Sequence, residues 1–159
     1  MVVLRKHRFK ILFSFVLVLV LGAFAFLYCV HIPYVENQSN LITIRNQILE
    51  DNQLVYDDYF YQYSDENIYY IIRVLQSDTS TYLVYDQYLN ELDSFRYDVK
   101  EESFIQEVFF SRYSVECGSI EVAYENERFV YFVKYTGEEG LIYAYYDLYS
   151  GQFIKGIQL

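Results

Sequence analysis

The sequence has no tryptophan, one proline and only two cysteines and two histidines in 159 residues. His7 and His31 both flank an apolar run near the N-terminus, so no histidine is left in the C-terminal part. This excludes Ser-His-Asp and Cys-His nucleophilic sites and histidine-ligated zinc there. Cys117 has no cysteine partner in that part, so an intramolecular disulfide within it is impossible. Cysteine poverty in an exported domain is typical of a bacterial surface protein.

Acidic residues are missing before Glu36, and four of the twelve cations precede it: Arg5, Lys6, Arg8 and Lys10. Residues 31–159 therefore carry the other 8 cations and all 22 acids, a net charge of −14. This charge repels phosphate backbones and excludes nucleic acid as a partner. Disorder is excluded as well, because 53% hydrophobic and 21% aromatic residues can bury a core.

An uncharged run of 20 residues extends from Ile11 to Val30. At 1.5 Å per residue it spans roughly 30 Å, the thickness of a bilayer core. We therefore predict a transmembrane helix over residues 11–31, ended by Pro33. The basic tail, residues 1–10, should lie in the cytoplasm by the positive-inside rule. The expected product is a single-pass protein of the cell membrane with an extracellular C-terminal part.

A cleaved signal peptide is the competing interpretation of this run. Ala23-Phe24-Ala25 resembles a signal-peptidase site after an apolar region. The apolar run continues for five residues past Ala25, which a cleaved precursor does not need. This continuation favours an uncleaved anchor.

The C-terminal part contains one pattern twice, at an offset of 61 residues. The offset places residues 68–75 on 129–136, and the Tyr-Asp pair Tyr85-Asp86 on Tyr146-Asp147. It also aligns Ile44 and Ile48 with Ile105 and Phe109. We interpret this as a duplicated unit of about sixty residues.

Each unit combines a helical pattern with strand patterns. Apolar residues at helical spacing precede aromatic and β-branched runs separated by Ser, Gly, Asn, Asp and Glu turns. The predicted fold is α+β, with a transmembrane helix followed by two tandem units over 34–98 and 99–159. Each unit should be a helix on an antiparallel sheet of three or four strands. The boundary, residues 97–100, has no Gly or Pro, so we expect the units to pack together.

Tyrosine is unusually common, with 20 residues. Most lie in predicted strands, where β-propensity explains them. Tyr59, Tyr61 and Tyr63 would alternate on one face of an exposed strand, and Tyr59 and Tyr61 have no tyrosine at the 61-residue offset. They are the predicted partner-binding residues, because tyrosine offers a large rigid surface with a polar tip.

No set of residues predicts catalysis. Neighbouring carboxylates occur, for example Asp57-Asp58 and Glu101-Glu102, but the density of acids alone accounts for them. Glycine-rich phosphate loops and calcium-loop patterns are absent from the sequence. We predict a protein that is not an enzyme, with no cofactor, no metal and no small-molecule substrate.

A motif near the C-terminus, together with the anchor and the duplicated unit, carries a family resemblance. The motif comprises Tyr131-x-Val133-x-Tyr135, then Gly140, Tyr143, Tyr146-Asp147, Ser150-Gly151 and Ile154-Lys155. The chain resembles the TseB-like (YpmB-like) cell-wall elongation regulators of Gram-positive bacteria. The resemblance implies two tandem cystatin-like or PepSY-like domains and association with a class B penicillin-binding protein. It supplies no catalytic residues, and relatives tend to have a strand tryptophan that is missing here.

Two functions follow as expectations. The first is a membrane-anchored interaction protein that regulates cell-wall elongation by binding a class B penicillin-binding protein. The second is a PepSY-like module that restrains a secreted or surface peptidase near the membrane. The identity of a trapped partner would discriminate between them.

Overall fold

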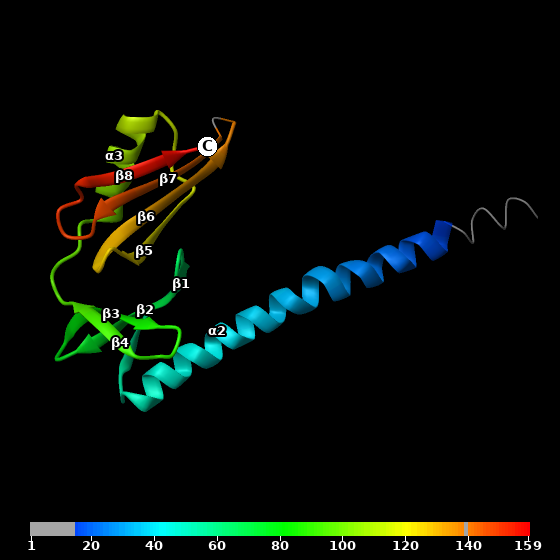
Figure 1. Cartoon of the computed structure of the whole chain (residues 1–159), viewed down its shortest axis with the longest axis horizontal. Helices are drawn as coiled ribbons and strands as arrows, with labels where there is room; N and C mark the ends of the chain where they lie inside the picture. Colours follow the sequence, from blue (N-terminus) through cyan, green and yellow to red (C-terminus); the bar gives the residue numbers. More distant parts are fainter. Residues whose placement is uncertain (1–14, 139) are drawn as a thin grey trace, which may run out of the picture. The chain divides into compact units, whose positions relative to one another are not determined.

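The computed structural model describes residues 15–138 and 140–159 (Figure 1). The predicted basic tail with Arg5, Lys6, Arg8 and Lys10, and the first residues of the predicted span, lie outside these ranges. The chain divides into two compact units, one ending at Asn46 and the other covering Gln47–Leu159.

The first unit is helical in its described part. A continuous helix runs from Phe15 to Asp51 and includes a π-helical turn, η1 (Leu27–His31), followed by α2 (Ile32–Asp51). The prediction that Pro33 ends the helix is therefore wrong. A proline ring collides with the carbonyl four residues earlier and has no N–H to donate. The wider π turn directly before Pro33, in which Ile32 N–H bonds to Leu27 O, accommodates it.

This helix is the one described helix that is long and apolar enough to cross a membrane. None of its most apolar 18-residue window is buried inside the protein. The apolar side chains between Phe15 and Val30 are therefore not covered by any other described part of the protein.

The second unit contains two antiparallel sheets of four strands each, in sequential order. The strands of the first sheet are β1 (Val55–Ser64), β2 (Ile68–Gln76), β3 (Thr79–Asp86) and β4 (Glu91–Phe95). Helix α3 (Glu102–Tyr113) connects it to the second sheet, β5 (Ser119–Glu125), β6 (Arg128–Gly137), β7 (Gly140–Asp147) and β8 (Phe153–Gln158). The α+β class with antiparallel sheets is confirmed. Strand β4, short and polar, was not among the strand patterns found in the sequence.

The two sheets repeat each other at the offset found in the sequence. Strands β3 and β7 begin and end 61 residues apart, and β2 and β6 end 61 residues apart. Tyr70 pairs with Tyr85 in the first sheet, as Tyr131 pairs with Tyr146 in the second. The registers also shift at equivalent points, after Val84 and after Tyr145.

The recurrent aspartate closes the same loop in both sheets. Asp86 Oδ1 accepts the backbone N–H groups of Tyr88 and Asn90, at 2.8 and 2.9 Å. Asp147 Oδ1 accepts the N–H and the hydroxyl of Ser150, at 2.7 and 2.6 Å. These bonds explain why the Tyr-Asp pattern recurs: the aspartate satisfies donors in a turn, a structural role.

Aromatic contacts join the first sheet to the second. Three ring pairs cross between them, with centroids 5.6 to 5.9 Å apart: Tyr63–Phe132, Tyr69–Tyr124 and Phe95–Phe129. One buried cluster contains Ile71 and Val84 of the first sheet together with Val130 and Tyr131 of the second. The core is therefore shared, in keeping with both sheets lying in one unit.

Two helices also contribute buried residues to the second unit. Ile105 and Phe109, both 0% exposed, are the buried residues of α3 and belong to the shared cluster. Ile48 is the buried residue of α2 and lies in its last turn, within the second unit. Leu83 and Tyr85 are buried but lie outside the shared cluster, which contains residues from the other face of the first sheet. Both faces of this sheet are therefore buried.

Thr81 is a defect in this core. It is 0% exposed, and its hydroxyl has no hydrogen-bond partner among residues 15–138 and 140–159. At the 61-residue offset its counterpart is Ile142, which is apolar. We expect Thr81→Val to raise the free energy of unfolding by about 1 kcal/mol, because it removes an unpaired buried hydroxyl without changing the shape.

Urea titration of the full chain in detergent micelles, followed by tyrosine circular dichroism, measures this change. Thr79→Val is the matched control, because Thr79 lies two residues earlier in β3 and is exposed. An unchanged or lower stability for Thr81→Val would mean that the hydroxyl is satisfied in solution.

Candidate interaction site

A bulge in β1 positions the tyrosines that follow it. The pairing with β2 shifts between Tyr56 and Tyr59, which leaves Asp57 and Asp58 out of register. Arg73 Nε holds the bulge through the Asp57 carbonyl at 3.0 Å and its carboxylate at 2.8 Å. Bulges bend a strand and increase its twist. The later part of β1 lies beside β5, which it contacts (Figure 1).

Tyr59 bonds to the edge of β5. Its hydroxyl accepts the backbone N–H of Val122 at 2.7 Å and can donate to the Val122 carbonyl at 3.3 Å or to Glu121 Oε2 at 3.2 Å. Burial raises the pKa of the Tyr59 phenol well above its ordinary value, and Glu121 adds to the effect. Tyr59 thus satisfies backbone groups of an edge strand that has no strand neighbour there.

Glu121 should make stability depend on pH. Burial raises the pKa of its carboxyl, the bond from Tyr59 opposes this, and the charge of Glu102 adds to it. The folded state then holds the proton more tightly than the unfolded state. Stability should be full below the ordinary glutamate pKa and fall as the pH rises through the window up to the raised pKa. At pH values above the raised pKa, the lost free energy of unfolding should stay constant.

We expect Glu121→Gln to remove this fall and to be more stable than the native chain at neutral pH. The amide keeps an acceptor for Tyr59 and carries no charge to desolvate. Urea titrations at a series of pH values from mildly acidic to neutral test this, with the exposed Glu107→Gln as control. Parallel pH profiles for Glu121→Gln and the native chain would contradict the expectation.

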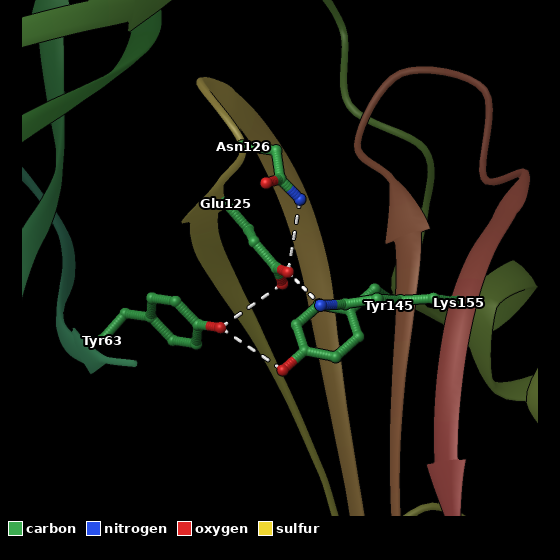
Figure 2. Close-up of polar contacts among 5 residues, drawn as sticks. All are labelled: Tyr63, Glu125, Asn126, Tyr145 and Lys155. Atoms are coloured by element: carbon green, nitrogen blue, oxygen red, sulfur yellow. Dashed lines mark hydrogen bonds and ion pairs between the residues drawn. The ribbon is translucent and has the colours of Figure 1, made fainter. Parts of the chain in front are cut away.

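Tyr63 of the first sheet joins a polar network of the second sheet, in which its hydroxyl faces Tyr145 and Glu125 (Figure 2). Its ring is 4% exposed, and its hydroxyl lies 3.3 Å from the Tyr145 hydroxyl and 3.5 Å from Glu125 Oε2. A phenol has one proton, so it can donate to one of these groups at a time. Burial raises the pKa of Tyr63, and Tyr145 and Glu125 raise it further.

Lys155 completes the network from β8. Its ammonium group forms an ion pair with Glu125 Oε1 and lies 4.5 Å from the centre of the Tyr145 ring. Asn126 Nδ2 donates to the same carboxylate at 3.4 Å. The bond to Glu125 is the main cause that raises the pKa of Lys155. Glu125 is therefore paired with a cation, and the charge of Asp65 also stabilises the ammonium group of Lys155.

The expectation that Tyr59, Tyr61 and Tyr63 form an exposed strand face is wrong. The three side chains do share one face, but this face packs against the second sheet and its shared cluster. The hydroxyl groups of Tyr59 and Tyr63 form intramolecular hydrogen bonds. Tyr61 is half-buried, and its ring lines a groove, so it remains accessible in part.

Two cavities adjoin Tyr63. The acidic cleft, about 820 Å³, includes five carboxylates and one cation in its lining: Asp65, Glu66, Asp93, Glu125, Glu127 and Lys155. The aromatic groove, about 480 Å³, is lined chiefly by rings and by the end of β8: Tyr61, Phe132, Tyr143, Tyr145, Ile157 and Leu159. Tyr63 and Asp65 line both, so the two cavities are neighbours.

The tyrosine pattern in the sequence indicated β1, but it did not indicate the residues that lie opposite β1. Glu125 is the last residue of β5, Asn126 lies in the turn after it, and Lys155 lies in β8. Nothing in their spacing in the sequence brings them to Tyr63. The one signal in the sequence is that Tyr59 and Tyr61 have no tyrosine counterpart at the 61-residue offset, whereas Tyr63 falls on Tyr124. Within residues 15–138 and 140–159, no group of three or more His, Cys, Asp or Glu residues could hold a metal ion.

The chain was compared with known proteins. No family model, curated protein or solved structure matches it.

Proposed function

We propose that this chain is a single-pass, membrane-anchored interaction protein with a cytoplasmic N-terminus. Outside the membrane, its two-sheet unit regulates cell-wall elongation by binding a class B penicillin-binding protein. Each of the two sheets, together with the helix that precedes it in the chain, is one of the tandem cystatin-like or PepSY-like domains that the family resemblance implies. The acidic cleft and the aromatic groove are the contact surface.

One observation carries the anchoring: the most apolar window of the Phe15–Asp51 helix has no residue buried in the protein. Apolar side chains left uncovered over such a length favour a lipid environment, in which a helix satisfies all its own backbone groups. Four cations before the apolar run Ile11–Val30 and a net charge of −14 over residues 31–159 favour a cytoplasmic N-terminus.

Binding is favoured by the chemistry of the second unit. Tyr61 and Tyr143, both half-buried, provide rigid aromatic surface in the groove that adjoins a cleft rich in carboxylates. A surface of this sign steers a partner face that carries Lys or Arg and accelerates encounter at low salt.

Topology is tested by adding protease to intact protoplasts that express the full chain. We expect loss of the two-sheet unit and retention of a membrane-embedded stub. A mature protein that begins near Phe26 would overturn the anchor.

The partner is tested by crosslinking in living cells with an affinity-tagged full chain, followed by mass spectrometry of the captured proteins. The expected capture is a class B penicillin-binding protein. A peptidase would favour the PepSY-like alternative instead, and capture of neither would overturn the proposed function. A strain that expresses a chain with a scrambled two-sheet unit behind the same helix is the control for capture through the membrane alone.

A further inference from the structure

The aromatic groove offers a rigid platform for apolar side chains. The Phe132 ring lies 5.4 Å from the Tyr143 ring and 5.2 Å from the Tyr145 ring, so three rings from β6 and β7 pack against one another. Phe132 and Tyr143 are half-buried, whereas Tyr145 is buried. Tyr61 of β1 and Lys134 of β6 also line the groove. Aromatic side chains in such an arrangement contribute large contact area at a small loss of conformational entropy.

The neighbouring acidic cleft defines the charge of the occupant. Its single cation, Lys155, is already paired with Glu125. Asp65 and Glu66 are exposed in the β1–β2 turn. An occupant with positive charge at this end gains electrostatic complementarity, while a polyanion is repelled.

The adjoining of the two cavities at Tyr63 and Asp65 favours one elongated occupant over two small ones. In an extended polypeptide, residues advance by about 3.3 Å, so a few residues carry one segment from an apolar to a charged environment. Lys and Arg can in addition place their charge over tyrosine rings, as Lys155 does over Tyr145 at 4.5 Å.

We propose that the aromatic groove and the acidic cleft together bind an extended polypeptide segment of the partner, with Arg or Lys at one end and aromatic side chains at the other. The aromatic end occupies the groove beside Tyr61, and the cationic end meets Asp65 and Glu66. This inference rests on the proposed function as an interaction protein and adds the chemistry of the bound segment.

The test uses the full chain in detergent micelles and a fluorescent nine-residue peptide with three arginines followed by alternating phenylalanine and serine. Fluorescence anisotropy measures binding at low and at moderate salt. One variant, Asp65→Lys/Glu66→Lys, reverses the charge of the cleft, and a second, Tyr61→Ser, removes a wall of the groove. Glu107→Lys/Glu116→Lys changes the net charge equally at a different cavity beside α3 and is the control. Tyr97→Ser, at an exposed tyrosine outside both cavities, is the control for Tyr61.

We expect at least a tenfold weaker affinity for Asp65→Lys/Glu66→Lys, which corresponds to about 1.4 kcal/mol, and a loss of most of the salt dependence. Tyr61→Ser should weaken binding without changing the salt dependence. Both controls should bind like the native chain. Thermal unfolding of every variant should remain cooperative, with a midpoint above the temperature of the binding assay, so that altered binding is not a loss of fold.

The inference is overturned if the charge-reversal control weakens binding as much as the cleft variant, since the attraction is then not local. It is also overturned if a peptide with glutamine in place of arginine binds equally well, or if chitin oligosaccharides bind the groove and the peptide does not. If the cleft variant still captures the same partner in cells as the native chain, the proposed function stands and only the inference about the segment falls.

Discussion

Phe109→Ala is expected to lower the free energy of unfolding by about 3–5 kcal/mol, the range for removing a large aromatic side chain from a core. Phe109 is 0% exposed in α3, belongs to the shared cluster, and its ring lies 4.9 Å from that of Tyr113. Alanine would leave a cavity between α3 and the second sheet. Since small domains are stable by about 5–15 kcal/mol, this single change should remove a large part of the total.

Phe110→Ala is the matched control. It changes the neighbouring residue of the same helix by the same atoms, but Phe110 is 54% exposed. We expect a change below about 1 kcal/mol for it, as for most surface substitutions. Urea titration of both variants in micelles gives the comparison. Equal losses for the two would mean that α3 does not pack on the sheet through Phe109.

Tyr63→Ser is expected to destabilise the chain by about 3 kcal/mol. The serine loses the ring contact with Phe132 and cannot reach the Tyr145 hydroxyl or Glu125. Part of the loss is apolar contact, and part is an unpaired polar group in a buried place. Tyr63→Phe separates the two, because it keeps the ring and should lose only about 1 kcal/mol.

Tyr61→Ser is the comparison in the same strand, at a half-buried residue for which no hydrogen bond is present among the described residues. It should have a clearly smaller effect on the unfolding midpoint than Tyr63→Ser. If both serine variants unfold at the native midpoint, the two sheets do not share a core through β1. Thermal denaturation of the three variants and of the native chain decides between these outcomes.

The duplicated unit was predictable because it depends on local patterns. The residues that form the ladders, such as Tyr85 and Tyr146, recur at one offset, and so do the aspartates that close the loops after β3 and β7. A repeat of this kind preserves the alternation of buried side chains along each strand, which a sequence displays directly. The short polar strand β4 lacks this alternation, which is why it was missed.

The continuation of the helix through Pro33 could not be predicted from the proline alone. Proline removes a hydrogen bond in an α-helix, and only the π turn of η1 makes the residue compatible with a continuous helix. Such a turn has no reliable sequence signature, because its formation depends on what surrounds the helix and on its hydrogen bonds as much as on its residues.

The sequence by itself determined the class of the chain: an apolar span after a basic segment, an acidic and aromatic remainder, and two copies of a helix-and-strands unit. These properties follow from composition and short-range periodicity, which need no knowledge of long-range contacts. The tertiary structure decided how the tyrosines of β1 are used. Tyr59 and Tyr63 lie at the second sheet because a bulge bends β1 toward β5, and residues 62 and 82 positions apart then become hydrogen-bond partners. Exposure of a strand face is a property of what packs on it, and for β1 that neighbour is the second copy of the same unit.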